Sequence, residues 1–199
     1  HDAFPEQIWK KASDIGLIGM HYPEECSGQG MGIFENVLVI QNLARGDASV
    51  GICLAMAGYG AELILHYGTA GQQQKWLPPV AEGQMLSCLA ATEPGLGNDV
   101  DRSETAAVLE NGEYVISGTK SFVINAGPLA GFYLVLCRTD SEEASPEKAF
   151  SILLVEADRI GILVQPAGSK LGRRLMHMGQ VRFDQVRVPQ DNLVGQKGN

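Results

Sequence analysis

The chain has 199 residues, a formal net charge of -8 and a hydrophobic content of 45%. That content is enough to form the core of one large domain or of two small ones. Acidic and basic residues are scattered along the sequence, so no basic face is expected that would bind nucleic acid or anionic lipid. The longest uncharged run, residues 48–61, is shorter than a membrane-spanning helix, and no membrane span is expected.

The cysteines and histidines form no recognisable motif. The cysteines are far apart and make no CxxC pair, which favours a reducing compartment over a disulfide framework. The histidines lack the spacing of metal ligands, so no metal site is expected, and the Met-His-Met run at 176–178 indicates ordinary packing. The cysteines are Cys26, Cys53, Cys88 and Cys137, and the histidines beyond the first residue are His21, His66 and His177.

The first part of the chain has helical start and stop signals. Pro5 suits a first helical turn and Gly16 a C-terminal stop, which predicts a short amphipathic helix between them. A loop rich in glycine follows, and a second helix is predicted over about residues 33–44. The apolar face expected for the first helix consists of Ile8, Ala12 and Ile15.

Two further helices are predicted before residue 85. Asp47 can cap a third helix, which would continue to Gly68 and is apolar on nearly every side. Thr69 can cap a fourth helix, and the pair Pro78 and Pro79 is expected to bend or break it. Residues 1–85 are therefore predicted to form an α-helical bundle domain.

From residue 86 onward the apolar pattern changes to period two and turn signals become frequent, which predicts an antiparallel, barrel-like β domain over 86–199. The fold class is thus α+β. Asn111 and Gly112 supply the positive φ angles of a type I′ hairpin turn. The acidic segment 140–148 is expected to be a solvated loop. Further strands are predicted at 131–138, 150–156, 162–166 and 181–188.

The segment ATEPGLGND, at residues 91–99, is a glycine-rich turn that follows a predicted strand. Gly95 and Gly97 suit positive φ or a close backbone approach, and successive N–H groups there could hold a flat or anionic ligand. Taken alone, a tight turn stabilised by Asn98 and Asp99 is the commoner explanation. No third glycine and no helix follow, so the turn is not a dinucleotide-binding fingerprint.

Together with its neighbours, this turn resembles the flavin-binding middle domain of acyl-CoA dehydrogenases. The matching motifs are TEPGLGND at 92–99, the hairpin containing Gly112 and Tyr114, GTKSFVIN at 118–125, and Val188-Pro189. The helical half also resembles that family, in YPEECSGQGMG, DASVGICLAMAG and YGTAGQQQKWLPPVAEG. The resemblance covers essentially the whole chain and implies FAD as cofactor and α,β-desaturation of an acyl-CoA thioester.

Carried over position by position, the resemblance implies two flavin-binding segments. Fixed donors, such as the Thr92 hydroxyl, would stabilise the negative charge that the ring gains on hydride arrival. Asn98 would also border the path of the substrate. The implied cofactor contacts are Leu89, Ala91 and Thr92 on the isoalloxazine, Gly97 and Asn98 near the pyrophosphate, and Phe122, Val123 and Ile124 on another part of the ring.

The sequence departs from the family pattern at three of these positions. Asn98 replaces the usual serine, Phe122 replaces a tryptophan, and Ile124 replaces a threonine and so lacks a hydroxyl. The backbone N–H of Ile124 remains available to the flavin N5. We expect flavin binding to survive these changes, whereas redox tuning and the identity of the electron acceptor stay open.

No catalytic residue is expected in these 199 residues. In this family the glutamate that removes the α-proton lies in a C-terminal helical domain, and no glutamate here matches it, which implies a fragment of the enzyme. Glu93 is expected to have a structural or cofactor-supporting role. The resemblance further implies an electron-transfer flavoprotein as partner, a homo-oligomer at full length, and a bacterial cytoplasmic or mitochondrial matrix location. The alternatives are an oxygen-using flavoenzyme of the same superfamily and a non-catalytic partner subunit.

Overall fold

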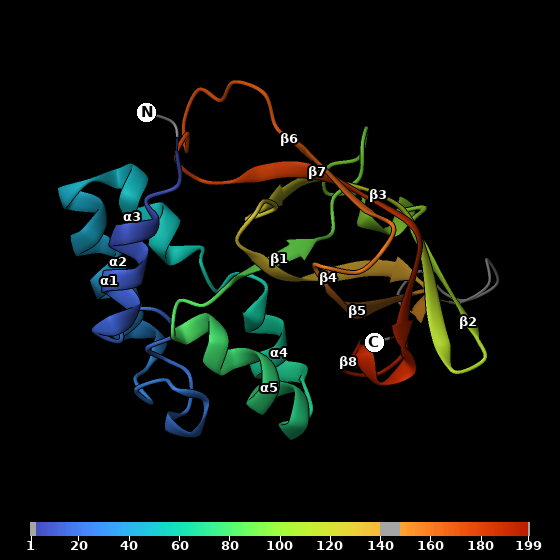
Figure 1. Cartoon of the computed structure of the whole chain (residues 1–199), viewed down its shortest axis with the longest axis horizontal. Coiled ribbons are helices and arrows are strands. Elements are labelled where there is room, and N and C mark those ends of the chain that lie inside the picture. The colour runs from blue at the N-terminus through green and yellow to red at the C-terminus, as the bar shows by residue number, and fades with distance from the viewer. Residues whose placement is uncertain (1–2, 140–147, 199) are drawn as a thin grey trace. The chain divides into compact units, whose positions relative to one another are not determined.

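The structure is a computed structural model, and it describes residues 3–139 and 148–198 (Figure 1). It contains helices and a large sheet, so the α+β fold class is confirmed. The chain divides into two compact units. The helical unit comprises the residues up to Ser87 together with Gly168–His177, and the β unit comprises Cys88–Ala167 together with the residues from Met178 onward.

Helix α1 (Glu6–Asp14) forms where the sequence predicts it, and Gly16 follows at a φ of 72°. Its buried face is different from the predicted one. Trp9, Ala12 and Ser13 are buried, whereas Ile8 is 46% exposed and Ile15 is 68% exposed. The prediction for Ile8 and Ile15 was therefore wrong, because the large Trp9 ring determines which face of this short helix is covered.

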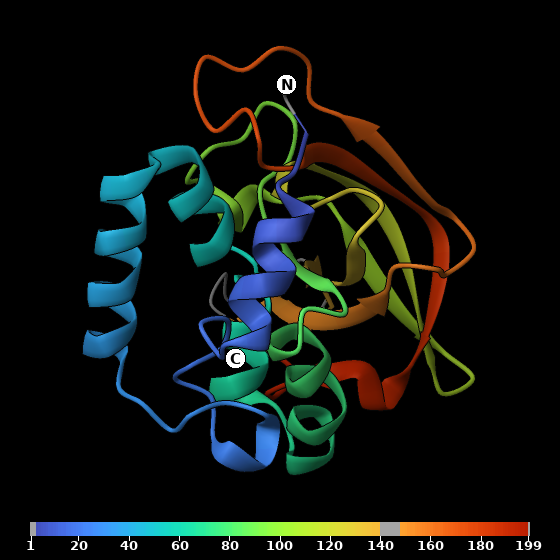
Figure 2. The same cartoon turned by 60° about the vertical axis from the view of Figure 1, so that its left-hand side comes forward.

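Helix α2 (Ile33–Gly46) starts at the predicted residue and ends slightly later; it is the long light-blue helix in Figure 2. None of its residues is buried. Phe34 is 67% exposed and Val37 is 53% exposed. The part of the chain that the structure describes thus leaves an apolar face of α2 uncovered.

The single helix predicted between Asp47 and Gly68 is two helices, α3 (Ala48–Ala55) and α4 (Ala61–Tyr67), so that prediction was wrong. The chain breaks at residues 56–60, which include two glycines of low helix propensity. A Cβ atom on one of them, Gly58, would lie 2.4 Å from the Tyr22 hydroxyl. Close packing against Tyr22 therefore requires a glycine at this point.

Asp47 caps helix α3 as predicted. Its Oδ1 accepts hydrogen bonds from the backbone N–H groups of Ser49, at 2.8 Å, and Val50, at 3.0 Å. Replacement of Asp47 by alanine is expected to lower the free energy of unfolding by about 0.5–2 kcal/mol, because both donors lose their partner. Urea denaturation followed by circular dichroism measures this effect. Asp47→Asn, which keeps the acceptor oxygen, is the matched control and should retain most of the stability.

Helix α5 (Ala70–Ala81) begins at Thr69 with a capping box, as its start signal predicts. The helix continues through Pro78 and Pro79, so the expected break does not occur, and the expected bend stays a prediction. Both prolines lie in its last turn and lack the N–H groups that would donate to the preceding turn, but their carbonyls still accept hydrogen bonds from the N–H groups of Glu82 and Gln84, at 2.9 Å each. Burial of Leu77 and Val80 holds that turn in place. Among the described residues, no helix is long and apolar enough to cross a membrane.

In the residues that the structure describes, the β unit is one sheet of eight strands. The order is β6-β7-β3-β2-β4-β5-β8, with β1 paired to β4. Strands β2 and β4 pair in parallel, and the other neighbours in this order pair antiparallel. Within the described residues the sheet is not closed, so β6 and β8 are edges. The strands are β1 (Leu86–Ala90), β2 (Ala106–Glu110), β3 (Glu113–Ile124), β4 (Ala130–Arg138), β5 (Phe150–Glu156), β6 (Ile162–Pro166), β7 (Met178–Pro189) and β8 (Leu193–Val194).

The β2–β3 hairpin has the predicted turn, with Asn111 at a φ of 52° and Gly112 at 84°. The long strands β3 and β7 lie side by side and curve together (Figure 1). Their register shifts at two places, between Ile116 and Gly118 and between Lys120 and Val123, and such irregularities bend a strand. Residues 140–147 of the predicted acidic loop lie outside the described residues. Short 3₁₀ helices are η1 (Glu24–Cys26), η2 (Val100–Arg102) and η4 (Gln190–Asn192).

Candidate functional site

The glycine-rich turn lies between β1 and η2, at residues 91–99. Gly95 has a φ of 77°, a left-handed backbone conformation that favours glycine. Gly97 has no positive φ, and a Cβ atom added to it would meet no atom within 4 Å. The described residues therefore give no structural reason for a glycine at 97. Asn98 is exposed beside it.

A buried ion pair joins this turn to strand β3. The Lys120 ammonium lies 2.9 Å from Glu93 Oε1 and also donates to the Ala91 carbonyl at 2.9 Å. The Glu93 carboxylate accepts further hydrogen bonds from the backbone N–H groups of Thr105, at 2.9 Å, and Glu104, at 2.8 Å. The turn and strand β3 are thus joined to each other and to the chain segment that precedes β2.

The same hydrogen bonds determine the charge of the pair. Burial alone would raise the pKa of Glu93, but hydrogen bonds from Thr105, Glu104 and Lys120 outweigh burial and hold that pKa below its usual value. Burial lowers the pKa of Lys120, and the contact with Glu93 offsets part of this effect. Two backbone donors and an ammonium group therefore keep Glu93 as a carboxylate.

The second predicted segment is the end of strand β3. Phe122 has a φ of 56° and its side chain is 69% exposed, although it is aromatic. Val123 is 1% exposed and belongs to the core of the sheet, so any contact it makes with a ligand would come from its backbone. Ile124 is partly buried. The exposed Phe122 ring is available to cover a flat ligand.

The structure brings the first predicted flavin segment, at Thr92, next to the start of the second, at Ser121. The Ser121 N–H donates to the Thr92 carbonyl at 2.7 Å, directly before Phe122. Leu89, Ala91 and Thr92 are only partly buried, so their surfaces remain available. Lys120 is not among the site residues predicted from the sequence. The signal that could have identified it is the pair of opposite charges in the two family motifs, a glutamate in TEPGLGND and a lysine in GTKSFVIN.

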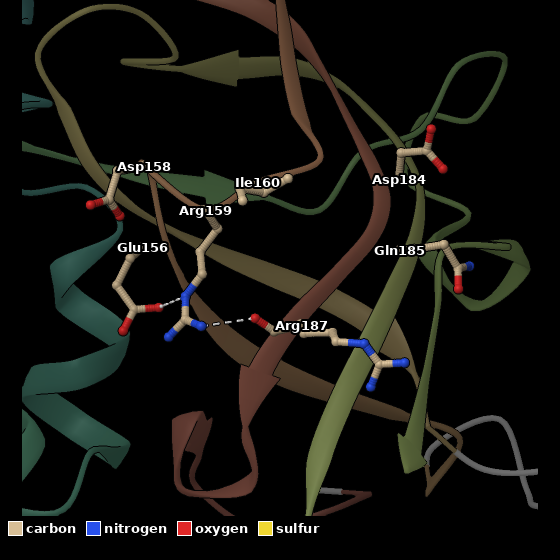
Figure 3. Close-up of a pocket in the computed structure, with 7 residues that line it drawn as sticks. All are labelled: Glu156, Asp158, Arg159, Ile160, Asp184, Gln185 and Arg187. Carbon is tan, nitrogen blue, oxygen red and sulfur yellow. Dashed lines mark hydrogen bonds and ion pairs between the residues drawn. The ribbon is translucent and has the colours of Figure 1, made fainter. Parts of the chain in front are cut away.

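A separate hollow of about 850 Å³ lies on the β unit (Figure 3). Both of its arginines are already paired: Arg159 Nε lies 2.8 Å from Glu156 Oε2, and the Arg187 guanidinium lies 3.0 Å from Glu110. No predicted flavin contact lines it. The lining residues are Glu156, Asp158, Arg159, Ile160, Asp184, Gln185 and Arg187.

The remaining candidates pack as structural groups. His21 lies 2.8 Å from Glu62, and the His177 ring packs on Phe4 with 5.4 Å between centroids. Met176 is buried, as ordinary packing predicts. The four cysteines are free and buried. In the part of the chain that the structure describes, no group of three His, Cys, Asp or Glu side chains could hold a metal ion.

Comparison with protein families matches both halves of the chain. The acyl-CoA dehydrogenase N-terminal domain matches residues 1–84, and the acyl-CoA dehydrogenase middle domain matches residues 88–186. An acyl-CoA dehydrogenase of Bacillus subtilis is 33% identical over 100% of this chain and 52% of its own length. The mitochondrial short-chain specific acyl-CoA dehydrogenase of Sus scrofa is 32% identical over 98% of this chain and 47% of its own length.

Solved structures agree with this result. The acyl-CoA dehydrogenase of Geobacillus kaustophilus has a TM-score of 0.91 and 29% identity, with 99% of this chain and 52% of that chain covered. The acyl-CoA dehydrogenase of Bacillus anthracis, solved as a complex with FAD, has a TM-score of 0.87 and 30% identity, with 97% of this chain and 33% of that chain covered. A chain from a structure described as an electron transferring flavoprotein of Acidaminococcus fermentans has a TM-score of 0.92 and 29% identity, with 99% and 51% covered.

The chain spans about half the length of the curated relatives that it matches. Two domain matches in the family's order, along nearly the whole chain, confirm the resemblance drawn from the motifs. The chain belongs to the acyl-CoA dehydrogenase family.

Proposed function

We propose that these residues form the helical domain, 1–85, and the flavin-binding middle domain, 86–199, of an FAD-dependent acyl-CoA dehydrogenase that desaturates an acyl-CoA thioester between its α and β carbons. The observation that carries the proposal is the hydrogen-bonded contact between the two predicted flavin segments. The Thr92 carbonyl accepts from the Ser121 N–H at 2.7 Å, which places the turn beside the start of the segment that contains Phe122.

The residues present fit a flavin in three respects. Gly97 leaves open space beside its own backbone for a ligand, Phe122 exposes an aromatic ring, and Thr92 is a hydroxyl-bearing residue that is only partly buried. A bound FAD would supply the acceptor for the hydride that leaves the β carbon. We propose that Thr92 and the Ile124 N–H orient the polar edge of the ring and that Phe122 excludes water from it.

The other proposed contacts follow the same two segments. Leu89 and Ala91 would line the ring, Val123 would contribute its backbone, and Gly97 and Asn98 would lie near the pyrophosphate. Asn98 would also border the acyl-CoA path. We assign no catalytic residue to this chain, and we propose that the base that removes the α-proton lies elsewhere in the protein.

The proposed partners are those of a complete enzyme of this family. They are an acyl-CoA substrate, an electron-transfer flavoprotein that receives the electrons, and further copies of the same protein in a homo-oligomer. The match to a structure described as an electron transferring flavoprotein supports the second of these. The proposed location is the bacterial cytoplasm or the mitochondrial matrix.

The absorption spectrum of the full-length protein, recorded before and after anaerobic addition of an acyl-CoA panel, tests the proposal. Flavin bands that bleach with one acyl-CoA support a dehydrogenase. Absent flavin bands would favour a non-catalytic subunit, and peroxide formed in the presence of oxygen would favour an oxygen-using flavoenzyme.

Replacement of Gly97 by valine is expected to weaken FAD binding by at least about tenfold, since the added side chain occupies the space proposed for the pyrophosphate. Stability should change little, because a Cβ atom at Gly97 meets no atom within 4 Å. Titration of the apoprotein with FAD, followed by flavin fluorescence, measures the affinity. Gly168→Val is the matched control, because Gly168 likewise has no positive φ and no atom within 4 Å of an added Cβ. Equal FAD affinities for the two variants would contradict the placement of the pyrophosphate.

A further inference from the structure

Lys120 and Glu93 are the only buried charged side chains in residues 3–139 and 148–198. Lys120 is 0% exposed and Glu93 is 6% exposed. Desolvation of two charges is costly, and well-packed apolar residues often stabilise a fold as well as a buried ion pair does. Stability alone is therefore a weak explanation for this pair. A polar pair differs from an apolar one because its directional hydrogen bonds fix the positions of the backbone segments that it joins.

Each polar end of the pair holds a particular stretch of backbone. The Lys120 ammonium bonds the Ala91 carbonyl, one residue before Thr92. The Glu93 carboxylate, one residue after Thr92, bonds the N–H groups of Glu104 and Thr105. Thr92 therefore lies between two anchored residues, and its own carbonyl accepts from Ser121. These bonds leave the backbone at Thr92 little freedom to rotate.

The ion pair also lies next to the second flavin segment, residues 122–124. Lys120 lies at the start of the register shift that ends at Val123, and within that shift Phe122 takes its φ of 56° and exposes its ring. The buried Lys120 side chain is bonded to Glu93 and to the Ala91 carbonyl. These bonds anchor the strand at the residue where its irregular part begins. Phe122 thus follows two residues after the anchored Lys120, within the irregular part of the strand.

We propose that Lys120 and Glu93 are positioning residues of the flavin site, which hold Thr92 and Phe122 in the relative orientation that receives the isoalloxazine. The inference rests on the proposed function, since it presumes that FAD binds these two segments. Neither side chain needs to touch the cofactor. The role is exerted through the backbone of residues 91–93 and 120–122.

The test uses the full-length protein that carries this chain, with FAD as the probe. Lys120→Met, Glu93→Gln and the double variant are prepared as apoproteins and titrated with FAD, while urea unfolding of each is recorded separately. We expect each single variant to bind FAD at least about tenfold more weakly and the double variant to bind little worse than either, because both residues act as one unit. The visible bands of the bound flavin should shift in all three variants.

Arg187→Met is the matched control, because it removes an exposed ion pair, with Glu110, from the same sheet. It should leave FAD affinity and the flavin bands unchanged. Glu93→Gln keeps the shape of the side chain and one acceptor oxygen, so it serves if Lys120→Met does not fold. Lowered stability with unchanged FAD affinity and unchanged bands in the folded variants would overturn the positioning role. Failure of the unmodified protein to bind FAD would instead overturn the proposed function, and this inference with it.

Discussion

Replacement of Phe122 by alanine is expected to weaken FAD binding by about tenfold or more without loss of stability. The ring is 69% exposed, so few contacts within the described residues are lost. An aromatic side chain that covers a flat ligand contributes on the order of 1 kcal/mol or more, and 1.4 kcal/mol corresponds to tenfold in affinity. Titration of the full-length apoprotein with FAD, followed by fluorescence, measures the change.

Two further variants separate the ring contact from other effects. Ile160→Ala removes an apolar side chain that is 95% exposed on the same unit, and it should leave FAD affinity unchanged. Phe122→Gly should be no less stable than the unmodified protein, because glycine adopts a φ of 56° without strain. An FAD affinity for Phe122→Ala equal to that of Ile160→Ala would exclude Phe122 from the flavin contact.

Replacement of Phe183 by alanine should lower the free energy of unfolding by about 3–5 kcal/mol, since it opens a cavity in a close-packed core. Phe183 is 1% exposed on β7, and its ring meets that of Tyr133 edge to face at 6.0 Å between centroids. Urea denaturation of the full-length protein, with the loss of sheet followed by circular dichroism, gives the change in stability.

The matched control for Phe183 is Leu163→Ala on the neighbouring strand β6, where the side chain is 60% exposed. This variant should lose less than about 1 kcal/mol, as is usual for exposed positions. A similar loss for both variants would contradict the packing of the sheet core around Phe183.

The β part of the fold could be predicted closely from the sequence. Strand β5 has the predicted bounds, as does β6, because period-two patterns and turn residues are local signals. The helices were less predictable. Which face of α1 is buried depends on its neighbours, and the break before α4 depends on close packing between Gly58 and Tyr22. Neither is encoded in the periodicity of the helix itself.

The candidate site could be predicted as two segments, through the resemblance of motifs, but not as a connected structure. Glu93 and Lys120 are 27 residues apart, and their contact depends on the register of β3 and on the irregularity that follows Lys120. The open space at Gly97 and the exposure of Phe122 are likewise properties of the folded chain. The roles of the individual site residues stay predictions until FAD binding is measured.

The burial of all four cysteines has a practical consequence for spectroscopy. Cys26, Cys53, Cys88 and Cys137 are each buried, and burial raises the pKa of every one of these thiols, so they are poor nucleophiles in the native state. A maleimide dye added to the folded chain has no accessible native thiol to modify. A single cysteine introduced at Leu171, which is fully exposed, would therefore carry the label alone, without removal of any cysteine from the background sequence.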